Sequence, residues 1–297
     1  MSRDSDTTFV QRGGAGLELS GEELDSLFSA ALSKALAAVS VLGGGGSKVL
    51  ILPPDITRFH SRAGLLTGIA CRELEGPGTG AAVTVMPALG THTPMSGGEL
   101  ARMYPGVAAE KFRVHRWRDD VVELGRLEAD WVERITAGAV RYDWPVQVNR
   151  LLRDGGFDLI ISIGQVVPHE VAGMANHAKN IFVGTGGQEA IDKSHFAGAV
   201  YVMERIMGRT DNPVRALFDE GFRRFGDQLP PILWVLTVVD PGNTVRGLFA
   251  GFGRECFEKA AALAGEVNVN LLDEPVEKAV VFLEPAEFRT TWLGNKA

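Results

Sequence analysis

The sequence predicts an α/β protein with a Rossmann-like, mainly parallel sheet and helices on both faces. Apolar runs at residues 48–54, 81–87 and 157–163 have the length and composition of buried parallel strands, and helical patterns alternate with them. Small and polar residues follow each run, as they do at the ligand-binding edge of open α/β sheets. A chain of 297 residues, 45% of them apolar, is long enough to bury a large core.

Composition excludes several classes of protein. The net charge of −7 disfavours a nucleic-acid surface, which requires clustered Lys and Arg. No apolar run approaches the roughly 20 residues of a membrane span, and the N-terminus lacks the apolar core of a signal peptide. Cys71 and Cys256 form no metal motif. We therefore expect a reduced cytoplasmic protein with neither a nucleic-acid nor a membrane partner.

Local signals place the first elements. The polar, Gly-rich start predicts a loose segment or a short strand. A helix is expected after Ser20, whose spacing from Glu23 is that of a capping box, and Ser96 with Glu99 repeats the signal. The GGGGS sequence at residues 43–47 precedes a strand instead of following one, so we interpret it as a connector and not as a phosphate loop.

Polar residues follow the first two apolar runs. Asp55, Arg58 and His60 come directly after the first run, and His92 follows the second. At the carboxyl end of a parallel strand such residues are placed to meet a ligand. Arg58 can hold a carboxylate in a bidentate pair. An Asp55–Arg58 pair that only staples the turn is an equal alternative.

The remaining elements follow in order. KFRVHRWRD, residues 111–119, alternates in polarity, which predicts a partly exposed strand with a structural His115. A helix is expected from Arg141 to Asp154, before the strand at 157–163. Beyond residue 194 the sequence predicts helices at 195–208, 212–226 and 253–270, a hairpin at 229–251 and a strand at 278–285.

The stretch Val166–His195 concentrates reactive side chains. Around a GTGG turn it carries three of the six histidines and two lysines, namely His169, His177, His195, Lys179 and Lys193. At the end of a parallel strand such residues can supply general bases, a metal ligand and an amine nucleophile. The alternative is that these histidines are ordinary hydrogen-bonded structural residues.

Four motifs occur in a fixed order. They are D-x-T-R at 55–58, G-T-H at 90–92, a histidine and a lysine at 169 and 179, and a histidine at 195. In their order and spacing the chain resembles the nickel-dependent lactate racemase family, over about residues 48 to 297. GQVVPHEVAGMANHAKNIFVGTGG and the TWLGNKA ending are more similar to a branch of sugar-acid, mannonate-type epimerases.

The resemblance implies a cofactor. Family members carry a nickel-pincer nucleotide, a nickel pyridinium bis-thiocarboxylate mononucleotide that is covalently tethered. Lys179 would form the tether, His195 would ligate nickel, and Asp55 would hold the nucleotide portion. Imidazole and sulfur ligands suit nickel. The enzymes that make this cofactor would be partners of the chain.

The resemblance also implies an isomerase. His92 and His169 would be the two catalytic bases, one on each face of a small hydroxy-acid substrate. Arg58 and Lys296 would bind the substrate carboxylate. Inversion of a 2-hydroxy acid by hydride transfer requires such groups, because a base must take the hydroxyl proton while hydride leaves the 2-carbon. Since the two histidines follow different strands, we expect them to face each other across a shared cleft.

The residues of the loops suggest which substrate is bound. The methyl group of lactate cannot pair with polar side chains, yet the loops carry six of them: His60, Thr91, Thr93, Asn176, His177 and Gln188. Unpaired polar groups cost about 1–3 kcal/mol each when buried, so a polyhydroxylated acid of gluconate or mannonate type is expected over lactate. We also expect a structural or supporting role for His177 and a possible substrate contact for His60.

Domain organisation and rival functions complete the expectations. Residues 1–272 are expected to form an N-terminal cofactor- and substrate-binding domain, and residues 276–297 the first strand of a C-terminal domain, so that the chain is a fragment of a longer protein. Lactate racemase is the nearest alternative function. A nicotinamide-dependent dehydrogenase lacks support because no G-x-G-x-x-G follows a first strand. A non-catalytic nucleotide-binding homologue is the third alternative.

Overall fold

A six-stranded sheet forms the centre of the protein. The computed structural model describes residues 7–39, 46–270, 272–274, 276–278 and 280. The strands lie in the order β1-β10-β9-β6-β2-β3. Their bounds are Thr8–Gly13 for β1, Lys48–Leu52 for β2, Ala82–Val85 for β3, Leu159–Gln165 for β6, Ile232–Val239 for β9 and Val245–Gly251 for β10.

The loops that follow the parallel strands of this sheet all lie at one edge. β3, β2, β6 and β9 run parallel, whereas β10 and β1 are antiparallel additions. The predicted α/β fold class is therefore confirmed. From β2 the chain goes outward to β3, and it later returns to the other side of β2 to form β6. Such a reversal opens a crevice between the loops that leave β2 and β6, which is the usual ligand site of open α/β sheets.

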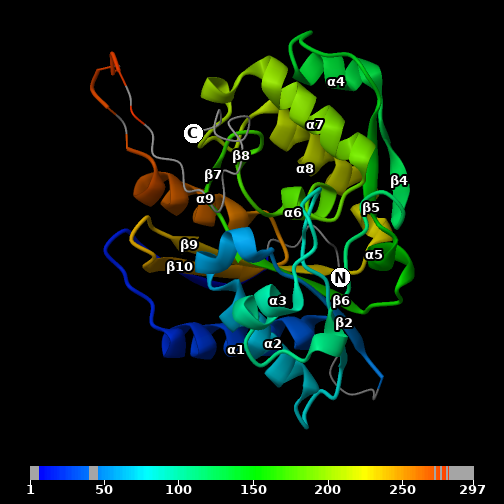
Figure 1. Cartoon of the computed structure of the whole chain (residues 1–297), viewed down its shortest axis with the longest axis vertical. Helices are drawn as coiled ribbons and strands as arrows, with labels where there is room; N and C mark the ends of the chain where they lie inside the picture. Colours follow the sequence, from blue (N-terminus) through cyan, green and yellow to red (C-terminus); the bar gives the residue numbers. More distant parts are fainter. Residues whose placement is uncertain (1–6, 40–45, 271, 275, 279, 281–297) are drawn as a thin grey trace.

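Helices cover both faces of the sheet. On one face lie α1 (Gly21–Ala38) and α2 (Ala63–Glu75), and on the other lie α6 (Ala178–Phe182), α7 (Gln188–Tyr201) and α8 (Pro213–Phe225), as Figure 1 shows. The strands bury alternate residues on each side: Val49 and Ile51 of β2 join one core, and Leu50 and Leu52 the other. Every residue of β6 and β9 is buried, which explains their unbroken apolar runs.

The predicted caps and turns are confirmed. Ser20 and Glu23 form the capping box of α1, and Ser96 and Glu99 form that of α3 (Gly97–Met103). Pro213 occupies the first turn of α8 behind the Asn212 cap. The expected hairpin is β9–β10, and the helix predicted after it is α9 (Glu255–Asn268). The GGGGS connector lies largely outside the described residues, as does most of the strand expected at 278–285.

Two predictions for the middle of the chain are wrong. The helix expected from Arg141 to Asp154 is strand β5 (Trp144–Asn149) followed by the single-turn helix α5 (Arg150–Asp154). β5 pairs with β4 (Val121–Leu127), and Trp144 is fully buried. Its valines favour a strand because β-branched side chains pack well on a pleated surface.

The segment KFRVHRWRD is the second error. Phe112 forms an isolated bridge with Val85, and the residues after it run as an irregular segment that joins no strand. This geometry buries His115, which bonds to Gly186 O at 3.0 Å and to Asn149 at 3.0 Å. The predicted structural role of His115 is thus confirmed, although the predicted strand is not.

The remaining elements are short. They are the 3-10 helices Ile56–Ser61, Ala109–Lys111, Met203–Arg205 and Gly226–Gln228, helix α4 (Ala129–Ile135), and the two-residue strands β7 (Pro168–His169) and β8 (Gly173–Met174). Among the described residues, none of the helices combines the length and apolar character that a membrane span requires.

Candidate active site

The loops after β2, β3 and β6 supply the predicted site residues. Asp55 and Arg58 follow β2, His92 follows β3, and His169 lies just past the end of β6. Because these strands are parallel and adjacent, their carboxyl ends share one edge of the sheet. Helices α6 and α7 then bring Lys179 and His195 to the same edge.

Asp55 and His92 form a hydrogen-bonded pair across two loops. Asp55 Oδ2 lies 2.6 Å from His92 Nδ1. The ionised carboxylate only accepts hydrogen bonds, so Nδ1–H of His92 donates and the neutral ring keeps its lone pair on Nε2. The side chain of His92 is 59% exposed, whereas Asp55 is buried. An imidazole oriented by a carboxylate, with its other nitrogen facing solvent, is suited to take a proton from a ligand.

The carboxylate of Asp55 is held from its own side as well. It caps the 3-10 helix Ile56–Ser61, accepting from Thr57 N at 3.1 Å and Thr57 Oγ1 at 2.5 Å. Burial raises the pKa of Asp55, but the hydrogen bonds from His92 and Thr57 outweigh burial and lower its pKa overall. Both oxygens of Asp55 are therefore engaged within the protein.

The Nδ1 atom of His169 accepts hydrogen bonds, whereas that of His92 donates one. Its Nδ1 accepts hydrogen bonds from the backbone amides of Val171 at 3.1 Å and Ala172 at 3.3 Å. A nitrogen that accepts carries no proton, so the neutral ring bears its hydrogen on Nε2. His169 is buried, and burial followed by the charge of Lys179 lowers its pKa well below the ordinary value. The nearby carboxylate of Glu170, 3.5 Å from Nδ1, opposes this shift.

Lys179 lies on α6, next to His169 and Arg58. Burial is the largest influence on its amine and lowers its pKa to about 8, and the charge of Arg58 acts in the same direction. A substantial fraction of the amine is therefore neutral and nucleophilic near neutral pH. The charge of Arg58 lowers the pKa of both Lys179 and His169, and the charge of Lys179 lowers that of His169, so the three side chains are close in space.

His195 also reaches this cluster, although not from the predicted position. It was expected to begin the helix after the GTGG turn, but α7 begins at Gln188, directly after Gly187, so His195 lies in the middle of the helix. Its Nδ1 donates to Ile191 O at 2.7 Å, which leaves the lone pair of the neutral ring on Nε2. A charge on His195 lowers the pKa of His169, so the two rings are near each other.

The other predicted residues lie elsewhere. His177 is buried between Trp234 and Phe257, with ring centroids 4.3 and 5.0 Å away, which confirms its structural role. Lys193 pairs with Glu189 at 2.7 Å and donates to Asp143 O. His60 is exposed on the loop after β2. Lys296 lies outside the described residues.

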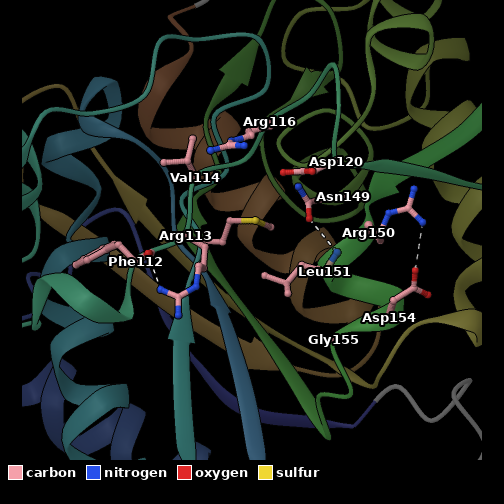
Figure 2. Close-up of a pocket in the computed structure, with 11 residues that line it drawn as sticks. Phe112, Arg113, Val114, Arg116, Asp120, Asn149, Arg150, Leu151, Asp154 and Gly155 are labelled. Atoms are coloured by element: carbon pink, nitrogen blue, oxygen red, sulfur yellow. Dashed lines mark hydrogen bonds and ion pairs between the residues drawn. The ribbon is translucent and has the colours of Figure 1, made fainter.

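Two cavities have walls that include none of the clustered site residues. One of about 480 Å³ is lined by residues that include Arg113, Arg116 and Arg150, and Figure 2 shows Arg150 turned toward Asp154. The other, of about 860 Å³, runs beside α8 and has His177 in its wall. Neither cavity brings together the residues that the sequence singles out, so the strand-end cluster is the candidate site.

The donor set limits the kind of cofactor that fits. Within the part of the chain that the structure describes, no three His, Cys, Asp or Glu side chains are grouped to hold a metal ion. His195 offers the imidazole nitrogen Nε2, and both His195 and the amine of Lys179 lie near His169. These residues fit a metal that arrives within an organic group bringing further ligands, with the amine as a point of attachment.

Two further residues belong to the site and were missed from the sequence. Glu170 is adjacent to His169 and is the carboxylate that raises the pKa of both His169 and Lys179. Arg215, on α8, is buried and lowers the pKa of Lys179 through its charge. Glu170 was recognisable as the direct neighbour of a candidate histidine. Arg215 has no local signal, because its contacts lie about forty residues earlier in the chain.

This fold and this cluster define an α/β protein with a cationic, histidine-lined site at the switch point of a parallel sheet. The chain belongs to the lactate racemase N-terminal domain family, whose model matches residues 22–206. That range includes all of the predicted site residues except Lys296.

Solved structures support the fold. A crystal structure of a Thermotoga maritima protein, determined by the Northeast Structural Genomics Consortium, is 25% identical with a TM-score of 0.76, over 90% of this chain and 63% of that one. The lactate racemase apoprotein from Thermoanaerobacterium thermosaccharolyticum is 18% identical with a TM-score of 0.62, over 89% of this chain and 58% of that one. The chain thus spans about three fifths of these proteins. No curated protein matches it.

Proposed function

We propose that the chain is the cofactor- and substrate-binding part of a nickel-dependent isomerase that inverts the 2-carbon of a 2-hydroxy acid. The observation that carries this proposal is the gathering of six side chains at one edge of the sheet, in a chain of the lactate racemase family. They are Asp55, Arg58, His92, His169, Lys179 and His195.

The cofactor in this proposal is the nickel-pincer nucleotide, which when bound supplies the hydride acceptor. Lys179 would hold it covalently, since burial leaves its amine partly neutral. His195 would ligate the metal through Nε2, because its Nδ1 donates to Ile191 O. The enzymes that make the cofactor would act on this chain as partners.

The two histidines would handle protons in this reaction. His92 can take the hydroxyl proton at Nε2, and the Asp55 carboxylate would stabilise the imidazolium that forms. Asp55 thereby gains a role that differs from holding the nucleotide. His169 offers Nε2–H and would first donate a hydrogen bond to the substrate oxygen. To act as a base it would need the other tautomer, at the expense of its two backbone hydrogen bonds.

The substrate carboxylate would be bound by Arg58, whose guanidinium lies beside Lys179 and His169. Lys296 would complete this contact. We propose that residues 1–272 form the cofactor- and substrate-binding domain and that residues 276–297 open a second domain. Fixing the carboxylate from two sides keeps the 2-carbon in register with the acceptor during transfer.

Within this reaction class we propose a sugar acid, of gluconate or mannonate type, as substrate. Two of the six polar groups that suggested it lie inside the protein: His177 is buried among aromatic rings, and Asn176 is buried with its Oδ1 bonded to His177 N. His60, Thr91, Thr93 and Gln188 are exposed around the same edge of the sheet. Their hydroxyl, imidazole and amide groups can pair a polyhydroxylated chain better than a methyl group.

The test is inversion of labelled substrate. Protein co-expressed with the cofactor-making enzymes would be assayed for nickel and incubated with gluconate, mannonate or lactate carrying carbon-13 at position 2, followed by NMR. We expect bound nickel, and inversion of the sugar acids with higher kcat/KM than lactate. Lactate kcat/KM equal to that of the sugar acids would refute the sugar-acid assignment alone. Inversion that requires added nicotinamide and no nickel would refute the cofactor and favour a dehydrogenase.

A further inference from the structure

Lys179 follows a turn with unusual backbone geometry. Asn176 and His177 have φ angles of 70° and 57°, in the left-handed region that residues other than glycine rarely adopt. Each such residue is less stable there than in a relaxed conformation. The turn leads directly into α6, where Lys179 is the second residue. Two consecutive strained residues persist only where the surrounding structure holds them.

Arg215 supplies that support from the helix behind the turn. It is buried on α8, and its Nη1 donates to Asn176 O at 3.2 Å while its Nη2 donates to Met174 O. Its guanidinium lies over the ring of Phe257, with 4.6 Å to the centroid. One planar side chain thus binds both carbonyls that flank Ala175, a fixed geometry that the fork of arginine provides and a lysine does not.

His177 fixes the other end of the turn by packing. Its ring stacks on Phe257 at an interplanar angle of 24° and on Trp234. Neither ring nitrogen has a hydrogen-bond partner among the described residues. The ring therefore stabilises the turn by packing alone. The hydrogen bonds that hold the turn come from Arg215 and from Asn176 Oδ1, which accepts from His177 N at 2.7 Å.

Arg215 also carries a charge toward Lys179. The charged groups facing the amine are Arg58 from the loop after β2, Arg215 from α8, Glu170 from the loop between β7 and β8, and Asp55. After burial itself, the two arginines lower the pKa of Lys179, and the two carboxylates raise it. Arg215 is not fully neutralised by its nearest acid, because Asp219 is bonded to Arg254 and burial raises its pKa.

We propose that Arg215 is a positioning residue for Lys179, clamping the turn that aims the amine into the site and placing a buried positive charge behind it. The inference rests on the proposed function only for the task it gives the amine. In this view the amine is held in place before any cofactor arrives, because α8 fixes the turn from which Lys179 projects and its arginine adds a positive charge to the effect of burial.

The test is acylation of the unloaded protein. N-hydroxysuccinimidyl acetate reacts with a neutral amine: the nitrogen bonds to the acyl carbon, N-hydroxysuccinimide leaves, and the amine proton passes to solvent. Rates at Lys179 and Lys193 would be measured from pH 6 to 10 by peptide mass spectrometry. Lys193, paired with Glu189 on α7, is the internal control. In the wild type we expect a midpoint for Lys179 near its pKa of about 8.

Two variants separate the clamp from the charge. Arg215→Met removes both, so the midpoint at Lys179 should rise by on the order of one pH unit and the rate should fall at least threefold, with Lys193 unchanged. Arg215→Lys keeps the charge and loses the clamp, so the rate should fall while the midpoint stays. A folded Arg215→Met with the wild-type midpoint and rate at Lys179 would overturn the proposal.

If Arg215→Met does not fold, as judged by circular dichroism, the acylation rate of the Arg215→Lys variant tests the clamp. An unchanged rate at Lys179 in that variant would overturn the clamp, and a rate that falls at Lys179 but not at Lys193 supports it. Because no cofactor is present, failure here leaves the proposed isomerase standing. Failure of nickel binding or inversion in the loaded protein leaves these acylation results unchanged.

Discussion

The candidate site contains two histidines with opposite hydrogen-bonding arrangements, the exposed His92 at what we call its rim and the buried His169 at what we call its floor. At the rim, His92 is largely exposed and donates Nδ1–H to the carboxylate of Asp55. At the floor, His169 is buried and accepts at Nδ1 from two backbone amides. One ring therefore presents a lone pair at Nε2 and the other presents a proton. Position and partners, and not residue type, decide what each imidazole can do.

Charge deepens this difference. Burial is the largest cause that lowers the pKa of His169, and the charges of Lys179, Arg58 and His195 act in the same direction, against Glu170. His92 lies instead beside the carboxylate of Asp55, at 2.6 Å. His92 and His169 therefore begin the reaction with the hydrogen on different ring nitrogens, and they cannot play identical parts in it.

Loss of either histidine is the largest expected effect. In the loaded enzyme, His92→Gln and His169→Gln should each lower kcat by on the order of a hundred- to ten-thousand-fold in both directions. Substrate inversion followed by NMR measures this, with circular dichroism as the control for folding. A folded variant that kept the wild-type kcat would show that its histidine takes no part in proton transfer.

Replacement of Asp55, the carboxylate partner of His92, should lower kcat less than loss of either histidine. Asp55→Asn keeps a hydrogen-bond acceptor for His92 Nδ1 but removes the charge that stabilises the imidazolium. We expect kcat to fall about ten- to a hundred-fold, because the neutral amide no longer stabilises positive charge that develops on the ring. A kcat equal to that of the wild type would show that Asp55 has no electrostatic part in the reaction.

At the floor, removing a reactive group should stabilise the fold. Lys179→Met deletes a buried charge and keeps the apolar stem, so at pH 7 the free energy of unfolding should rise by about 1–3 kcal/mol. The pKa of Lys179 is lowered to about 8 from 10.5, so the unfolded chain binds more protons between these values.

Wild-type stability should consequently increase from pH 8 to 10.5, and the advantage of the variant should vanish over that range. Urea unfolding at several pH values measures it. Lys193→Met is the matched control and should change stability by less than about 1 kcal/mol, because its pair with Glu189 is partly exposed. A Lys179→Met protein less stable than the wild type at pH 7 would contradict the account of the floor.

His115 offers a third histidine, buried but outside the cluster. Burial is the main cause that lowers its pKa to about 4, and the hydrogen bond with Gly186 O opposes this. Its neutral form is favoured in the fold, so stability should be lost as pH falls from about 6.5 through 4. His115→Gln should flatten that loss and cost about 1–3 kcal/mol at pH 7. A variant with the same acid dependence as the wild type would place the titration elsewhere.

Sequence patterns predicted which side chains gather at one edge of the sheet better than they predicted the secondary structure around them. Asp55, Arg58, His92 and His169 lie at that edge because parallel strands bring their carboxyl ends together whatever the loops do. The roles given to these residues stay predictions. The tautomers of the histidines were not predictable, since the amides that bind His169 Nδ1 depend on the exact turn after β7. Burial of His177 and the part played by Arg215 arise from α8 and α9, which are distant in sequence.

The errors in secondary structure have a common cause. A helix was expected at residues 141–154, but pairing with β4 stabilises a strand there, because tertiary contacts override a weak local preference. Residues 111–119 alternate like a strand, yet they form an irregular segment in which the His115 side chain is buried and bonded to Gly186 O. His195 was placed too early in its helix because Gly187, at the cap of α7, was taken as part of the turn.

Nitrogen-15 NMR of histidine-labelled protein tests the contrast between rim and floor most directly. Single replacements assign the ring signals, and long-range nitrogen–proton couplings at pH 7.5 report which nitrogen carries the hydrogen. The account predicts that His92 is protonated at Nδ1 and bare at Nε2, and that His169 is bare at Nδ1 and protonated at Nε2. The same tautomer in both rings, or a bare Nε2 on His169, would contradict it.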